Sequence, residues 1–301
     1  MEEERTGRRL TWTVAPRRDG QKVDTVLRRE LGLSGTVIRR VKWLPDGILL
    51  DGRRVYTSQR VRAGQELSVL VGETALRSGL TPAPGPLDIV YEDEDLLAVN
   101  KAPGVPSHTG PGHYDDTLGN FLMDYYQKRG IFADYHPVHR LDKGTSGLMV
   151  VAKHPHAQER LKEQFHTGAF RRTYLAVCEG RPEPEAGVVD APIGRVEGSL
   201  LAREVRADGQ PARTRYQVLR TGAGRALLRL ELETGRTHQI RVHMAHLGHP
   251  LTGDFLYGTE DTALIRRPAL HSAELELVQP LTGALIRLCV PLPEDMERLL
   301  N

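Results

Sequence analysis

The sequence has few cysteines, few aromatic residues and no long apolar run. Its two cysteines, Cys178 and Cys289, are too few for a disulfide framework, so we expect a reducing, cytoplasmic compartment. No stretch approaches the roughly 18 consecutive apolar residues of a membrane-spanning helix. The mixed-charge start "MEEERTGRRL" is not typical of a signal peptide. We therefore expect neither a disulfide-rich secreted domain nor a membrane partner.

The sequence also lacks a strong net charge, because its formal net charge is only +2 over 301 residues. The charge is uneven, because residues 1–75 carry more Lys and Arg than Asp and Glu, whereas residues 76–301 are slightly acidic. A basic first quarter is compatible with a polyanionic partner, although a solvated surface has the same pattern. The hydrophobic content of 39% is enough for one large domain, or for a catalytic domain with a small appendage.

A segment rich in proline and glycine divides the chain in two. The stretch "TALRSGLTPAPGP" reads as a linker. We predict an N-terminal extension (1–19), a small module (20–73), a linker (74–85) and a larger domain (86–301). No internal repeat is visible.

The small module is predicted to contain two short helices followed by a hairpin. Val23, Val26, Leu27 and Leu31 follow helical spacing, and Ser34 is a suitable N-cap for the second helix. The pair "DG" at 51–52 is typical of a two-residue hairpin turn.

Basic residues lie on the second of these helices. Arg39, Arg40 and Lys42 are placed largely away from its apolar side. This order of elements resembles the S4 RNA-binding module, in which such residues would contact phosphates without reading the base sequence. An amphipathic helix pair with a solvated basic face is the alternative interpretation.

The larger domain contains more strands than helices. Helical spacing and terminal glycines predict helices ending at Gly130 and Gly168, and apolar runs such as "GLMVVAK" predict buried strands. Because strands and helices do not alternate strictly, we predict an α+β fold with a mixed, largely antiparallel sheet, flanking helices and a central cleft.

The stretch "HRLDKGTSG" (139–147) places one carboxylate, Asp142, among basic neighbours directly before a buried strand. An aspartate has an ordinary pKa of about 3.9, so it is expected to be ionised and could act as a nucleophile or a base. Glycines in the turn would allow close approach of a substrate. A bracing role in the loop is the alternative for an aspartate taken alone.

A second constellation is "GRTHQIRVHMAHLGHPLTGD". We predict a helix from an N-cap at Thr237 to about Leu247, with Ile240, Met244 and Leu247 buried. Arg241 falls on another side, where it could form a bidentate pair with a carboxylate on a different element.

Two further features allow more than one interpretation. The histidines at 238, 243, 246 and 249 suggest zinc, but their spacing is not that of a known motif and Arg241 would repel a metal, so we expect none. Tyr174, in the strand-like "RRTYLAV", is either a core tyrosine or a ring that stacks on a base.

Taken together, the blocks "VNKAPG", "HRLDKGTSGLMVVAK", "RRTYLAV" and "GRTHQIRVH…GHPLTGD" resemble those of the RluA-type pseudouridine synthases in order and spacing. The resemblance runs from about residue 85 to the C-terminus. It implies isomerisation of uridine to pseudouridine in structured RNA, ribosomal or transfer RNA, by a monomer without cofactor or metal. A catalytically idle RNA-binding or ribosome-associated protein is the alternative.

The resemblance also assigns roles to individual residues. Asp142 would be the catalytic carboxylate, attacking the ribose or the uracil ring or acting as a base at the sugar. Tyr174 would stack on the flipped-out base, and Arg241 would pair with Asp142 and hold it ionised. The residues expected to bind RNA are Lys101, His139, Arg140, Arg236, Arg39, Arg40 and Lys42.

Overall fold

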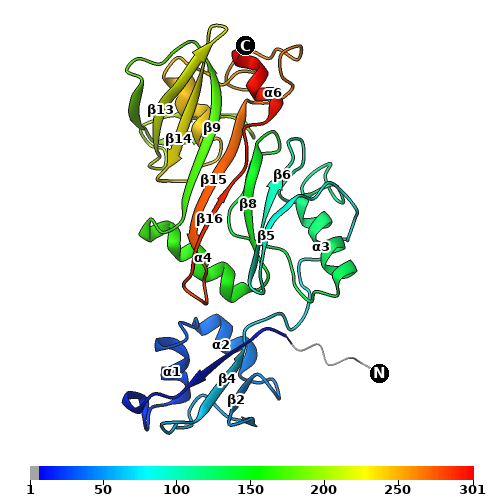
Figure 1. The fold of residues 1–301 in the computed structure, drawn as a ribbon, viewed down its shortest axis with the longest axis vertical. Helices are drawn as coiled ribbons and strands as arrows, with labels where there is room; N and C mark the ends of the chain where they lie inside the picture. Colours follow the sequence, from blue (N-terminus) through cyan, green and yellow to red (C-terminus); the bar gives the residue numbers. More distant parts are fainter. Residues whose placement is uncertain (1–6) are drawn as a thin grey trace.

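A four-stranded sheet near the N-terminus and a ten-stranded sheet organise the chain in a computed structural model, which describes residues 7–301 (Figure 1). The smaller sheet has the order β1-β4-β2-β3. Its strands are β1 (Arg9–Thr13), β2 (Ile48–Leu50), β3 (Arg53–Arg54) and β4 (Glu66–Leu70). Between β1 and β2 the chain forms the short 3-10 helix η1 (Pro16–Arg18) and the helices α1 (Val23–Arg29) and α2 (Gly35–Val41).

Local signals account for this N-terminal module. The Ser34 side chain accepts a hydrogen bond from the Val37 N–H, so the predicted N-cap is confirmed. Asp51 and Gly52 both have positive φ, as a two-residue turn between β2 and β3 requires. The structure adds β1 to the sheet through antiparallel pairing with β4. This strand lies within the predicted N-terminal extension (1–19).

The larger sheet is mixed and mostly antiparallel, so the predicted α+β fold is confirmed. Its main order is β10-β13-β14-β9-β15-β8-β6-β5, with β16 paired to β15 and β7 paired to β8. Only β15 and β8 pair in parallel among the strands of residues 7–301. The strands are β5 (Ile89–Glu92), β6 (Leu96–Lys101), β7 (His136–Pro137), β8 (Ser146–Ala152), β9 (Arg171–Glu179), β10 (Ala186–Asp190), β13 (Arg213–Gly222), β14 (Arg225–Leu232), β15 (Leu270–Val278) and β16 (Leu285–Cys289). A separate ribbon consists of β11 (Ile193–Arg195) and β12 (Arg203–Val205).

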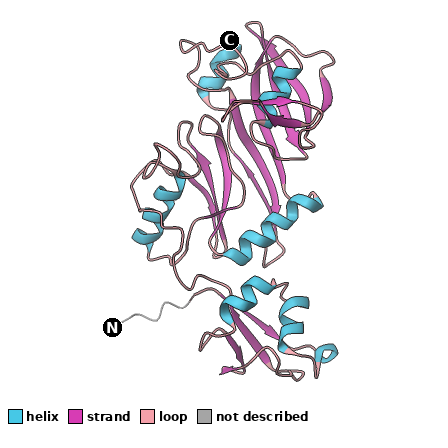
Figure 2. Cartoon of the chain, turned by 180° about the vertical axis from the view of Figure 1, so that it is seen from behind, coloured by secondary structure: helices cyan, strands magenta, loops and turns pink. Residues whose placement is uncertain are grey.

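Helices cover both faces of one half of this sheet. Leu97 and Val99 of β6 pack in the same cluster as α3 (Leu118–Arg129). Leu96 and Ala98 point the other way, into the cluster of α4 (Pro155–Thr167). Burial on both faces explains why β6 and β8 have apolar runs instead of alternating patterns. In both overall views α4 runs along the end of the sheet that faces the N-terminal module (Figures 1 and 2).

The remaining helices are α5 (Gln239–His246), α6 (Glu294–Glu297) and η2 (Arg298–Leu300). The predicted start of α5 was wrong by one residue. His238, not Thr237, is the N-cap, and its backbone is left-handed with φ of 57°. Ile240 and Met244 are buried as predicted, whereas Leu247 is 37% exposed. No helix within residues 7–301 is long and apolar enough to cross a bilayer.

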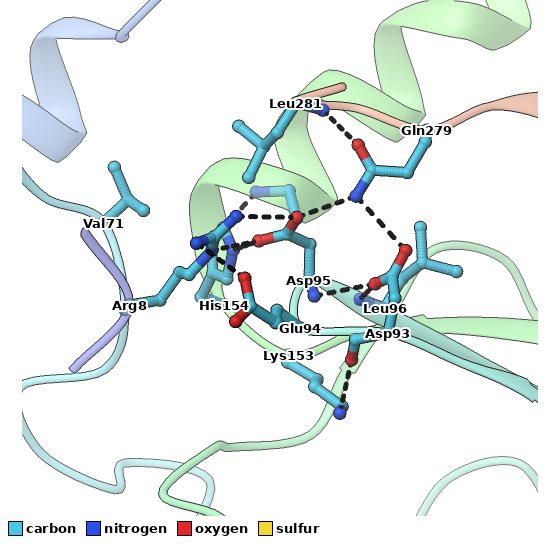
Figure 3. Close-up of polar contacts among 12 residues, drawn as sticks. Arg8, Val71, Asp93, Glu94, Asp95, Leu96, Lys153, His154, Gln279 and Leu281 are labelled. Carbon is cyan, nitrogen blue, oxygen red and sulfur yellow. Dashed lines mark hydrogen bonds and ion pairs between the residues drawn. The ribbon is translucent and has the colours of Figure 1, made fainter. Parts of the chain in front are cut away.

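An ion-pair cluster joins the module to the larger domain (Figure 3). Arg8 donates from Nε to Asp95 Oδ1 at 2.8 Å, and its Nη1 lies 2.7 Å from Glu94 Oε2. Asp95 also receives Gln279 Nε2 at 2.7 Å and lies 3.1 Å from His154 Nε2. Burial alone would raise the pKa of Asp95, but the hydrogen bonds from His154, Arg8 and Gln279 outweigh it and hold that pKa well below its usual range. We call Arg8, Asp95, His154 and Gln279 the junction cluster.

Candidate active site

Three segments meet at the middle of the large sheet and line a cavity of about 450 Å³. The loop before β8 supplies Asp142, strand β9 supplies Tyr174, and α5 supplies Arg241. The loop can enter the sheet here because Gly147 has φ of 107°, and a Cβ at this position would lie 2.3 Å from the Ser272 carbonyl oxygen. The close approach of β8 to β15 therefore fixes the point at which the Asp142 loop leads into β8.

Asp142 is a partly exposed carboxylate near two cationic or potentially cationic groups. Its side chain is 24% exposed. Oδ2 lies 3.6 Å from Arg241 Nη1 and 3.8 Å from His238 Nε2, both beyond ordinary hydrogen-bond distance. Within residues 7–301 no side-chain hydrogen bond to this carboxylate is formed. Arg241 therefore places a positive charge beside this carboxylate while leaving its oxygen lone pairs available.

Arg241 forms its bidentate pair with a different carboxylate. Nε and Nη2 donate to the two oxygens of Asp254, each at 2.7 Å, and both side chains are buried. Burial would lower the pKa of Arg241, but the hydrogen bond and charge of Asp254, with the charge of Asp142, raise it above the ordinary value. Asp254 was not singled out from the sequence, although it closes the quoted block "GHPLTGD". It orients the guanidinium that faces Asp142.

Tyr174 lies in the wall of the cavity. It is buried with 5% exposure and is paired in register with Leu230 on β14 and Ser272 on β15. Burial, together with the charge of Asp142, raises the pKa of its phenol. Tyr174 is thus a neutral ring beside the carboxylate, as a stacking partner requires.

Two of the predicted RNA-binding residues line the cavity with exposed cations. Arg140 is exposed and has no hydrogen bond or ion pair to another residue in the described part of the chain. Arg236 is also exposed, and its Nε donates to the Pro211 carbonyl at 3.0 Å. Neither guanidinium is neutralised by a carboxylate within residues 7–301, so both can accept a phosphate as a partner.

Lys101 is placed differently from the prediction, which had it contacting RNA. Its side chain is buried, and Nζ donates to the carbonyls of Ala102 at 3.0 Å and Val105 at 2.8 Å, with a longer contact of 3.4 Å to Lys143. Burial lowers its pKa to about 7. The ammonium has almost no surface for a phosphate, and it braces the loop that carries Asp142.

His139 and Arg40 also have internal partners. His139 Nε2 accepts the Val150 N–H at 3.2 Å, and burial lowers the pKa of this imidazole to about 3, so it carries no charge for a phosphate. Arg40 donates from Nη2 to the carbonyls of Val71 at 2.9 Å and Gly72 at 3.1 Å. The expectation that Arg40 lies on a solvated face is wrong, because its side chain is only 14% exposed.

The other two predicted contacts lie on the surface of the module. Arg39 is exposed, and Lys42 is half-buried with Nζ 4.9 Å from the centre of the Trp43 ring. Neither forms an ion pair with a carboxylate in the part of the chain that the structure describes. The histidines of the second constellation do not gather, and no group of three metal-ligating side chains occurs within residues 7–301.

A mixed, mostly antiparallel sheet, a cavity with one accessible carboxylate, a buried tyrosine and an oriented arginine are the features expected of an RNA pseudouridine synthase. The family model for RNA pseudouridylate synthase matches residues 95–246, which include all three side chains. The chain belongs to this family. The prediction of an RNA pseudouridine synthase is thereby confirmed.

Relatives align along nearly the whole chain. The RNA pseudouridine synthase YjbO of Bacillus subtilis (strain 168) is 42% identical over 90% of this chain and 96% of its own length. Ribosomal large subunit pseudouridine synthase D of Yersinia pestis is 39% identical over 97% of this chain and 94% of its own. The solved structure of human RNA pseudouridylate synthase domain containing 1 has a TM-score of 0.58 at 30% identity, covering 69% of this chain and 86% of that one.

Proposed function

We propose that Asp142 is the catalytic carboxylate for conversion of specific uridines to pseudouridine in large-subunit ribosomal RNA. The observation that carries this proposal is the free carboxylate between Tyr174 and Arg241 in a family of uridine isomerases. The ribosomal substrate is supported by the names of several relatives, including the large subunit pseudouridine synthase D of Yersinia pestis. Transfer RNA is the second candidate substrate.

The reaction requires little beyond an oriented carboxylate. The C1′–N1 bond breaks, the uracil rotates and the C1′–C5 bond forms, while the C5 hydrogen is lost and N1 gains one. Because this is an isomerisation, it consumes no oxidant or reductant. Asp142 can serve as nucleophile toward the ribose or the uracil ring, or as base at the sugar, since its oxygens have no side-chain hydrogen bond within residues 7–301.

Access to the base requires that the target nucleotide leave its stack. Flipping costs a few kcal/mol, and stacking on an aromatic ring returns about 1–3 kcal/mol per base. Tyr174 is an aromatic ring of the cavity wall that can make this contact. Arg140 and Arg236 would bind the flanking phosphates, and Arg39 and Lys42 on the S4-like module would bind a more distant part of the RNA.

The test is pseudouridine mapping of ribosomal and transfer RNA. RNA transcribed without modification is incubated with the purified wild type, with Asp142→Ala and with buffer, and each uridine is examined. We expect modification at few sites in large-subunit ribosomal RNA with wild type alone. Modification confined to transfer RNA would show that transfer RNA, not ribosomal RNA, is the substrate. Modification by Asp142→Ala would show that Asp142 is not the catalytic residue.

A further inference from the structure

We propose that His238, fixed in one tautomer by Tyr257, is a positioning residue that presents an N–H to the Asp142 carboxylate. The proposal rests on the proposed function of Asp142 and adds two residues to that site. His238 Nδ1 lies 2.8 Å from Tyr257 Oη, and its Nε2 lies 3.8 Å from Asp142 Oδ2. The imidazole therefore bridges the phenol and the carboxylate.

The hydrogen bonds of Tyr257 favour one position for the imidazole proton. The backbone N–H of Arg203 donates to Tyr257 Oη at 2.9 Å, so this oxygen is already an acceptor. A phenol has one proton, and the described residues offer it no acceptor other than His238 Nδ1. With Nδ1 accepting, a neutral imidazole carries its proton on Nε2, the nitrogen that faces Asp142.

Burial keeps this imidazole neutral. His238 is half-buried, and desolvation lowers its pKa. The charge of Arg241 lowers this pKa further, whereas the charges of Asp142 and Asp254 act in the opposite direction. The Arg241 guanidinium lies 5.0 Å from the centre of the Tyr257 ring, which places it on the same side of the site. Asp142 thus faces a permanent cation, Arg241, and a neutral donor, His238.

The backbone supports the same assignment. His238 is one of three residues other than glycine with positive φ within residues 7–301, at 57°. The left-handed conformation is uncommon for residues other than glycine, although histidine adopts it more often than most, and such residues cluster at functional sites. Here the left-handed residue is the N-cap of α5, and its Nε2 lies 3.8 Å from Asp142 Oδ2.

Neither donor reaches hydrogen-bond distance in this structure, at 3.6 Å for Arg241 and 3.8 Å for His238. A shift of less than 1 Å, of the kind by which catalytic hydrogen bonds tighten on substrate binding, would bring both into contact. The Nε2 proton would then orient the carboxylate and stabilise its charge. The opposite tautomer would instead direct a lone pair at a carboxylate and repel it.

Two substitutions of His238 separate its backbone role from its side-chain role. Asparagine tolerates the left-handed conformation, and its amide oxygen can replace Nδ1 as acceptor for Tyr257, but it has no group at the Nε2 position. Glutamine can place an amide N–H near that position. We expect His238→Asn to fold normally and to lower kcat by about 10- to 100-fold with KM nearly unchanged, as for loss of a hydrogen bond to a charged group. His238→Gln should recover part of that loss.

A tyrosine pair tests the tautomer itself. Tyr257→Phe removes the hydroxyl that fixes Nδ1 as acceptor, and Tyr216→Phe removes a buried hydroxyl that donates to the Pro184 carbonyl outside the cavity. Imidazole ¹⁵N NMR, with the His238 signals identified by their absence in His238→Asn, reports which nitrogen is protonated. We expect Nε2–H in wild type and in Tyr216→Phe, and a mixture in Tyr257→Phe with a lower kcat.

The outcomes distinguish this inference from the proposed function. Protonated Nδ1 in wild type, or wild-type kcat in His238→Asn, would overturn the role of His238 while leaving Asp142 untouched. If wild type forms no pseudouridine in any RNA, the proposed function fails, and the NMR experiment still decides the tautomer.

Discussion

Asp142 and Asp254 both lie beside Arg241, but they interact with it differently. Asp254 is fully buried and takes both hydrogen bonds of the guanidinium, whereas Asp142, with 24% of its side chain exposed, receives only its charge. A carboxylate held by two hydrogen bonds has fewer lone pairs for chemistry. The site therefore divides its two acids into one that orients Arg241 and one that remains reactive.

This division predicts different outcomes for the two isosteric substitutions. Asp142→Asn should abolish pseudouridine formation and change the free energy of unfolding by less than about 0.5 kcal/mol, because this side chain forms no hydrogen bond within residues 7–301. Asp254→Asn should lower that free energy by about 3–5 kcal/mol, since it leaves a buried guanidinium without its charge partner. Urea unfolding and a turnover assay measure both. Equal stability loss in the two variants would contradict the division.

Lys101 predicts a pH dependence of stability. Its pKa is about 7 in the folded chain against an ordinary 10.5, so the unfolded chain holds more protons between these values. The free energy of unfolding contributed by this group therefore rises with pH over that window, by up to about 1.4 kcal/mol per unit. Lys101→Met should lack this rise, which urea unfolding at pH 7, 8 and 9 measures as a wild-type-minus-variant difference that grows with pH.

Lys128, which is exposed and pairs with Asp124 one helical turn away, provides the control. Lys128→Met should leave the pH dependence of the unfolding free energy unchanged within a few tenths of a kcal/mol. Parallel curves for wild type and Lys101→Met would show that Lys101 keeps an ordinary pKa.

The sequence indicated the proposed catalytic residues better than the groups that surround them. Asp142 and Tyr174 lie in motifs with a recognisable order, and the structure places them in one cavity. The roles of Lys101 and Asp254 depend on groups that the fold brings near: the Lys143 carbonyl, beside those of Ala102 and Val105, for the first, and a guanidinium for the second. A lysine in a polar loop motif has no sequence signal that separates burial from exposure, so its interior position could not be predicted.

At the scale of elements, the parallel pair between β8 and β15 positions the Asp142 loop. The two strands are in register at Ser146 with His271 and at Gly147 with Ser272. The absence of a side chain at Gly147 allows this close contact, because a Cβ would meet the Ser272 carbonyl at 2.3 Å.

Gly147→Ala is therefore expected to be strongly destabilising. It combines a positive φ with a steric clash against backbone, and we expect a loss of at least about 3 kcal/mol in the free energy of unfolding. Gly130→Ala is the matched control, since Gly130 also has positive φ (67°) but has no atom within 4 Å of the added Cβ. It should cost about 1 kcal/mol. Equal losses in thermal or urea unfolding would mean that β8 moves away without penalty.

Predictions for elements succeeded where the signals were local. Thr117 and Asn120 form a capping box at the start of α3, and Gly130 ends it with a left-handed backbone, all within the helix's own sequence. The start of α5 was misplaced because the left-handed conformation of His238 accompanies contacts with Tyr257 and Asp142 that lie far away in sequence. Leu247 follows the apolar spacing, but it is the C-cap of α5 and is 37% exposed, because it lies at the end of the helix and not along its buried side.

At the scale of the whole molecule, the contact between the N-terminal module and the larger domain could not be predicted from the sequence. Proline and glycine content indicated the boundary near residues 74–85. Arg8 and Asp95, however, are 87 positions apart, and their pairing depends on how the two units dock. A second contact lies nearby, where Glu73 Oε1 is 2.5 Å from His136 Nε2. The N-terminal module is thus attached by side-chain contacts as well as by the chain.

Removing Arg8 should loosen the module without unfolding either unit. Arg8→Ala deletes the module's ion pairs with Glu94 and Asp95, while Asp95 keeps His154 and Gln279 as partners. A hydrogen bond to a charged group contributes about 1.5–3 kcal/mol, so the undocked population should increase by about 10- to 100-fold. Small-angle scattering and limited proteolysis within residues 74–85 measure this increase. On long ribosomal RNA the KM should rise, whereas kcat and the activity on a short stem-loop should not change.

Arg9→Ala separates docking from loss of charge. Arg9 is adjacent in sequence and carries the same charge, but it donates to Ser68 Oγ at 3.0 Å and to the Asp46 carbonyl at 2.7 Å, both within the module. If the junction cluster positions the module for RNA, Arg8→Ala alone increases proteolysis of the linker and KM for long RNA. Equal effects of the two variants would mean that basic charge near the N-terminus, not docking, is what long RNA requires. Unchanged proteolysis in Arg8→Ala would show that the contact of Glu73 with His136 is sufficient to hold the module.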